Sequence, residues 1–266
     1  MHKKYLKSLR FFSLYLMVVL LGISCASTSA LKDDAYLASA QKNFDMGVEL
    51  LDNERYEEAI SYFEHVRGKF PYSQYSALSD LKIAECYFNQ KKWIQAADSY
   101  DFFLRFHPRH AESEFATFRL GQSYMETLPS DFFLFPKSHT RDQKTTKDAL
   151  NAFNTLLERF PTSKYRDETL KMKASIVEKL ALHDMNIARF YQTRKRWPGA
   201  LKRFESVAEL YPESSSAPEA LYLGAQIALN ELGDKEKAKK LFAQLKEKYE
   251  KSSFAELAHK SDLADG

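Results

Sequence analysis

The stretch Ala59-Ile60-Ser61-Tyr62-Phe63-Glu64-His65-Val66-Arg67-Gly68-Lys69-Phe70-Pro71-Tyr72-Ser73 predicts the architecture of the whole chain, because its pattern recurs. A small residue, Ala59, is followed four positions later by the aromatic Phe63 and twelve positions later by Pro71. A pattern that recurs at intervals of some tens of residues indicates a repeat architecture. The further copies contain Ala96, Tyr100 and Pro108; Ala149, Phe153 and Pro161; Ala200, Phe204 and Pro212; and, without a proline, Ala238 and Phe242.

Each copy has the pattern of a helix that packs closely against the helix before it. The small residue lets two helix backbones approach, and the aromatic residue one turn later fills the space beside the contact. The proline ends the helix because it has no backbone N–H to donate. Upstream small residues mark the preceding helix at Gly47, Ala84, Gly121 and Ala188. These helix pairs resemble tetratricopeptide repeats, so we expect an all-α, right-handed solenoid of about five repeats.

The third repeat contains extra residues. Its two small residues, Gly121 and Ala149, are 28 positions apart, against 12 in the first, second and fourth repeats. The excess falls in residues 128–147, which we interpret as an insertion between residues 35–127 (repeats 1 and 2 and the first helix of repeat 3) and residues 148–266 (the remainder). A loop of that length inside a helix pair is often functional. The insertion contains an apolar cluster, which we call the apolar knot and which consists of Phe132, Phe133 and Phe135. This apolar knot either packs onto the solenoid or forms a docking patch.

The fourth repeat begins with an unusually long helix. No Gly or Pro occurs from Thr162 until Pro198, and residues 167–194 therefore predict one uninterrupted helix of about 42 Å at a rise of about 1.5 Å per residue. Its expected apolar stripe, interrupted by Asp184, consists of Leu170, Ala174, Val177, Ala181, Ala188 and Tyr191.

The N-terminus has the layout of an export signal. Four cations precede an apolar run at residues 11–21, which is shorter than the roughly 20 residues of a membrane-spanning helix. These cations, Lys3, Lys4, Lys7 and Arg10, account for the formal net charge of +3, since without them the chain has 35 basic and 36 acidic residues. We therefore expect no nucleic-acid partner, because binding phosphates requires a surplus of positive charge.

The segment Leu21-Gly22-Ile23-Ser24-Cys25 resembles a bacterial lipobox, although Gly22 stands where leucine is usual. We expect residues 1–24 to be removed as a signal peptide, Cys25 to carry lipid (palmitate among its acyl chains), and residues 25–34 to form a tether. An ordinary signal that is cleaved after Ala30 is the alternative.

Catalytic and metal-binding motifs are missing from the sequence: it has no His-Glu-x-x-His, phosphate loop, dinucleotide glycine pattern or nucleophile elbow. His107 and His110 flank a turn with Glu112 and Glu114 nearby, but no second cluster supplies the remaining ligands of a metal site. We therefore expect a turn between repeats, and neither a metal nor a cofactor. Cys86 is expected to be a buried small apolar residue. The mixed charges of residues 235–251 indicate a solvated helix face.

Irregular repeats behind a lipoprotein signal, with this insertion and this long helix, resemble the BamD family of repeat lipoproteins that assemble β-barrels in the outer membrane. The resemblance covers nearly the whole mature chain and is carried by Phe70 to Tyr75, Thr140 to Gln143, Phe160 to Tyr165 and Phe190 to Arg203. It implies a non-catalytic scaffold, lipid-anchored in the outer membrane and facing the periplasm. The implied partners are a POTRA-containing barrel-assembly protein, other Bam subunits and unfolded outer-membrane proteins.

Carried over by position, the resemblance implies that Arg203 contacts the POTRA domain; without the resemblance, this arginine is read as a solvated helix charge. Asn43, Asp80 and Tyr87 are candidates to line the concave surface of repeats 1 and 2 that receives substrate, with Tyr87 also a candidate core residue. Two alternatives remain open: another periplasmic tetratricopeptide lipoprotein, a scaffold for envelope or pilus assembly, and an enzyme fused to repeats.

Overall fold

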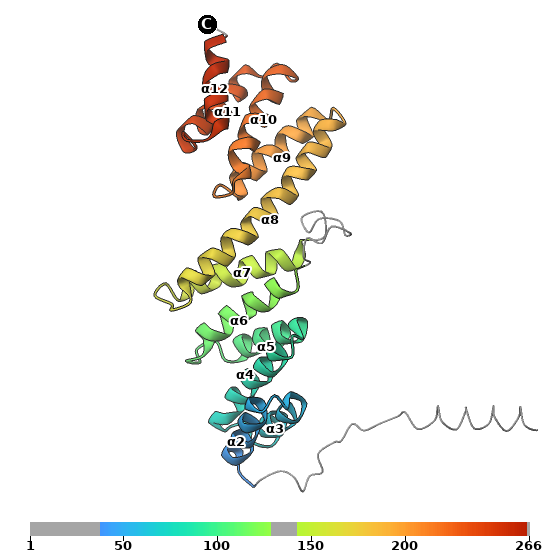
Figure 1. The fold of residues 1–266 in the computed structure, drawn as a ribbon, viewed down its shortest axis with the longest axis vertical. Coiled ribbons are helices and arrows are strands. Elements are labelled where there is room, and N and C mark those ends of the chain that lie inside the picture. Colours follow the sequence, from blue (N-terminus) through green and yellow to red (C-terminus); the bar gives the residue numbers. More distant parts are fainter. Residues whose placement is uncertain (1–37, 129–142, 265–266) are drawn as a thin grey trace, which may run out of the picture.

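A computed structural model describes residues 38–128 and 143–264 (Figure 1). Within these ranges every element of regular secondary structure is an α-helix. The helices are α2 (Ala40–Asp52), α3 (Tyr56–Lys69), α4 (Gln74–Asn89), α5 (Trp93–Phe106), α6 (Ser113–Glu126), α7 (Lys144–Arg159), α8 (Arg166–Thr193), α9 (Trp197–Leu210), α10 (Ser216–Asn230), α11 (Lys235–Lys248) and α12 (Ser253–Ala264).

The helices stack as antiparallel pairs along one elongated body (Figure 1). The pairs are α2 with α3, α4 with α5, α6 with α7, α8 with α9, and α10 with α11, and α12 packs at the C-terminal end. Each helix contacts mainly its neighbours in the sequence, as expected of a quasi-one-dimensional repeat protein. The predicted all-α solenoid of about five repeats is confirmed.

The small and aromatic residues of the repeat pattern form the contacts within the pairs. All the small residues of the second helices are buried, and so are the aromatic residues four positions later. In the first repeat the Phe63 ring lies so close to Gly47 that a Cβ atom there would be 2.6 Å from it. Phe153 lies against Gly121 in the same way. The ring thus occupies the space that a missing side chain leaves on the partner helix.

The prolines lie where the second helices end. The residue after each of α3, α5, α7 and α9 caps the helix and directly precedes a proline. Two of these prolines also accept a hydrogen bond from the following repeat: Arg159 Nη2 donates to the Pro108 carbonyl, and Tyr249 Oη donates to the Pro212 carbonyl, each at 2.8 Å. The turns therefore connect successive repeats as well as ending helices.

The long helix is confirmed, because α8 (Arg166–Thr193) has 28 residues. Its predicted stripe is wrong in the first half, where Leu170 is 41% exposed and Ala174 is also exposed. The first half of α8 lies beside α7, and the second half lies beside α9 and α10 (Figure 1). Since the two halves have different partners, the buried side changes along the helix. Its buried residues are Thr169, Ile176, Val177, Leu180, Ala181, Met185 and Ala188.

Asp184, which interrupts the predicted stripe, lies near the phenol of Tyr211. Burial and the negative charge of Asp184 together raise the pKa of Tyr211. Cys86 is fully buried, and burial raises the pKa of its thiol to about 12, which confirms that it behaves as a small core residue.

Several predicted segments lie outside the described residues. They include the signal peptide (residues 1–24), the tether (residues 25–34) with Cys25, and the apolar knot with Phe132, Phe133 and Phe135. Helix α7 begins at Lys144, so the last residues of the range 128–147 are helical. None of the described helices combines the length and the apolar composition of a membrane span.

Candidate functional site

Arg203 lies on the outer side of α9. The buried side of that helix carries Ala200, Phe204 and Val207, so the intervening arginine points outward. Its side chain is exposed and makes no hydrogen bond or ion pair with another described residue. The guanidinium is therefore available to an external carboxylate.

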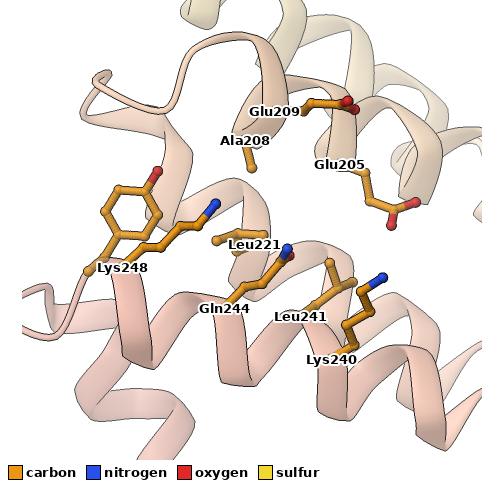
Figure 2. Close-up of a pocket in the computed structure, with 9 residues that line it drawn as sticks. Glu205, Ala208, Glu209, Leu221, Lys240, Leu241, Gln244 and Lys248 are labelled. Atoms are coloured by element: carbon orange, nitrogen blue, oxygen red, sulfur yellow. The ribbon is translucent and has the colours of Figure 1, made fainter.

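A cavity of about 320 Å³ lies between α9, α10 and α11 (Figure 2). Figure 2 shows the carboxylates of Glu205 and Glu209 on one wall and the amine of Lys240 on the other, above a floor that includes Leu221. An ion pair of 2.5 Å between Lys237 and Glu205 links the two walls. From the sequence, the mixed charges of α11 indicated only a solvated helix face. The cavity could not be predicted from them, because its facing wall comes from α9, in another repeat.

Asp80 connects the first two repeats. Its side chain, on α4, is only 6% exposed, and its carboxylate accepts a hydrogen bond of 3.3 Å from Arg67 on α3. The other carboxylate oxygen lies 3.0 Å from His107 Nε2, in the turn after α5. Asp80 also lines a cavity of about 230 Å³ together with Asp98 and Phe102. A buried carboxylate requires such partners, so its first role is to tie helices together.

Asn43 does not line a surface, in contrast to the prediction. It is fully buried in the first turn of α2, where its side-chain amide donates a 2.9 Å hydrogen bond to the Ser39 carbonyl. Tyr87 is half-buried and packs against the cores of both the first and the second repeats, and burial raises its pKa. The first helix of a repeat has neighbours on several sides, which leaves few of its positions open to solvent.

Sequence reasoning missed an arginine held between aromatic rings. The Arg119 guanidinium carbon, on α6, lies 4.3 Å from the ring centroid of Phe88 on α4 and 5.3 Å from that of Phe115. Arg119 Nη1 donates to Gln122 at 3.0 Å, whereas its Nε is buried and makes no hydrogen bond with a described residue. Phe115 and Arg119 are four residues apart and therefore share one helix face, and this spacing is the sequence feature that could have predicted their contact.

The two turn histidines have separate partners. His107 contacts Asp80, and His110 Nδ1 accepts a hydrogen bond of 3.1 Å from the Glu112 backbone N–H. In the described part of the chain, no three His, Cys, Asp or Glu side chains come together as metal ligands.

Stacked helix pairs with charged and aromatic side chains on their outer faces define a helical repeat protein of the tetratricopeptide type, a class that binds other molecules along extended surfaces. More specifically, the chain belongs to the YfiO family of outer membrane lipoproteins, whose model matches residues 38–245. The description of this family names no catalytic activity.

The chain is similar to curated relatives named outer membrane protein assembly factor BamD. The relative from Neisseria meningitidis serogroup A is 26% identical over 93% of this chain and 95% of its own length. The relative from Haemophilus influenzae is 28% identical over 78% of this chain and 79% of its own length. A solved structure of MamA from Desulfovibrio magneticus matches over 82% of this chain and 99% of its own, at 15% identity and with a TM-score of 0.36.

Proposed function

We propose that this chain is a non-catalytic assembly factor for outer membrane proteins, acting as a scaffold in a Bam complex. The observation that carries the proposal is the similarity to the assembly factor of Neisseria, which extends over 93% of this chain. Lipid on Cys25 would anchor the scaffold to the outer membrane on the periplasmic side. Its partners would be a POTRA-containing barrel-assembly protein, other Bam subunits and unfolded outer-membrane proteins.

Mild detergent extraction of outer membranes tests this function directly. The tagged chain is expected to co-purify with a barrel protein that carries POTRA domains. Recovery of an envelope or pilus assembly protein instead, in repeated extractions, would contradict the proposal and favour the alternative scaffold.

Arg203 is the proposed contact with the POTRA domain, supported by its exposure and by its unpaired charge. Arg203→Glu is expected to reduce recovery of the barrel protein by about tenfold or more, because charge reversal replaces attraction by repulsion at the interface. The measurement is quantitative co-purification at equal expression.

Lys202→Glu provides the matched control, since Lys202 is the exposed neighbour on the same helix and carries the same charge. The control is expected to retain most of the barrel protein. Equal losses for both variants, or no loss for Arg203→Glu, would remove Arg203 from the interface.

The repeat 2–repeat 3 junction around Arg119 is the proposed contact with unfolded substrate, supported by two half-buried rings and a guanidinium with an unpartnered Nε. Arg119→Gln is expected to weaken binding of a barrel-strand peptide about fivefold, since a partly desolvated cation–aromatic site contributes on the order of 1 kcal/mol. Fluorescence anisotropy of the labelled peptide measures the change. Arg105→Gln, at an exposed arginine on α5, should bind normally; a loss of the same size there would contradict the assignment.

A further inference from the structure

The corner between α8 and α9 concentrates positive charge, although the chain beyond its four N-terminal cations has nearly equal numbers of basic and acidic residues. Between Asp184 and Glu205 the sequence contains six cations and no acidic residue. One of these, Arg189, is neutralised by an ion pair of 2.6 Å with Glu219 on α10. The others lie at the corner and on the first turns of α9: Arg194, Lys195, Arg196, Lys202 and Arg203.

The tip of this corner consists of Phe190, Arg194, Lys195 and Arg196, which we call the basic corner. Phe190 is 54% exposed, and the guanidinium carbon of Arg194 lies 4.5 Å from its ring centroid. The three cations are exposed, and none forms an ion pair with a described residue. The basic corner therefore presents three uncompensated charges beside an exposed aromatic ring.

The geometry of the turn does not require these cations. Lys195 has φ of +55°, and the equivalent turns of the first, second and fifth repeats place Glu54, Lys91 and Gly233 in the same left-handed region. In the first two repeats the cation that follows is paired: Arg55 with Glu58, and Lys92 with Glu57 at 2.6 Å. The fourth repeat thus keeps the backbone conformation of its counterparts but lacks their compensating acids.

We propose that the basic corner binds the headgroups of anionic phospholipids at a membrane surface. An exposed phenyl ring can enter the interface while long cationic side chains stay with the phosphates, and each such cation is attracted by a negative surface. The turn lies at an outer edge of the solenoid in Figure 1, where a flat surface can reach it. The chain belongs to a family of outer membrane lipoproteins, so a membrane surface lies near the protein. This contact is independent of the proposed Bam assembly.

Vesicle binding tests the proposal. The chain from Ala26 onward keeps every described helix and leaves out Cys25, the proposed site of lipid attachment, so its binding reports on the protein surface alone. It is expected to co-sediment with vesicles of phosphatidylglycerol and phosphatidylcholine but not with phosphatidylcholine alone. Binding should weaken with added salt, because salt screens the attraction. Equal binding to both vesicles, or none to either, would overturn the proposal.

Two variants locate the contact. Replacing Arg194, Lys195 and Arg196 together by glutamine is expected to weaken binding to the anionic vesicles by about tenfold or more, since each cation near such a surface adds to the attraction. Phe190→Ser should weaken binding as well, without lowering the melting temperature, because the ring is exposed.

A matched control removes the same number of charges elsewhere. Lys69, Lys91 and Lys235 are exposed and lie on three different repeats, and their joint replacement by glutamine should leave vesicle binding nearly unchanged. An equal loss in this control would show that only net charge matters and would overturn the site. Unchanged vesicle binding by the corner variant, with loss of an acidic protein partner in extractions, would overturn it in favour of a protein contact.

Discussion

Replacing Phe153 by alanine is expected to lower the free energy of unfolding by about 3–5 kcal/mol, the range for truncating a fully buried phenylalanine. The ring projects from α7, is completely buried, and lies against Gly121 of α6. The neighbouring backbone atoms belong to two packed helices and cannot collapse into the space. Urea denaturation followed by circular dichroism measures the loss.

The same contact can be tested from its other side. Gly121→Ala adds a methyl group where the Phe153 ring lies, and the resulting overpacking should cost about 1–3 kcal/mol. In the double variant with Phe153→Ala, the added methyl group has room. The free energy of unfolding should therefore fall by less than the sum of the two single losses. The control is Gly68→Ala, on α3, where a Cβ would meet no atom within 4 Å. A Gly121→Ala variant as stable as this control would contradict the contact.

A proline in the middle of α8 is expected to have the second large effect. Lys179→Pro removes a backbone hydrogen bond and clashes with the preceding turn, at a cost of about 3 kcal/mol or more. The disruption should stay local, because the buried residues of α2 to α5 belong to clusters separate from the one that α8 shares with α7, α9 and α10.

Hydrogen exchange resolved by segment measures this outcome. Amides of α8 to α10 should lose protection in Lys179→Pro, while those of α2 to α5 keep it; Lys179→Ala, which preserves the helix, should resemble the original chain. Uniform loss of protection would contradict a stack of separable repeats.

The repeat pattern alone predicted the helix pairs, because each pair is specified by residues close together in the sequence. Phe63 lies one turn after Ala59 on the same helix and meets Gly47 on the helix before it. Such contacts need only local spacing and nearest neighbours, so they can be inferred without knowing the rest of the fold. The length of α8 was equally predictable, since no glycine or proline interrupts residues 166–193.

The surfaces could not be predicted in the same way. Asn43 was expected at a surface and is buried. The two partners of the Asp80 carboxylate are Arg67 and His107, which come from two neighbouring elements. Arg119 is held by a ring of the preceding repeat.

The sequence by itself therefore determined the helices, their pairing and the side chains that pack within each pair. Only the tertiary structure decided which side of α8 is buried, which charges are compensated, and that the cations of the basic corner have no acidic partners. The physical reason is that periodicity describes one helix face, whereas a helix in a stack has neighbours on several sides. Those neighbours belong to other repeats, and their side chains decide whether a charge is paired or open to a partner.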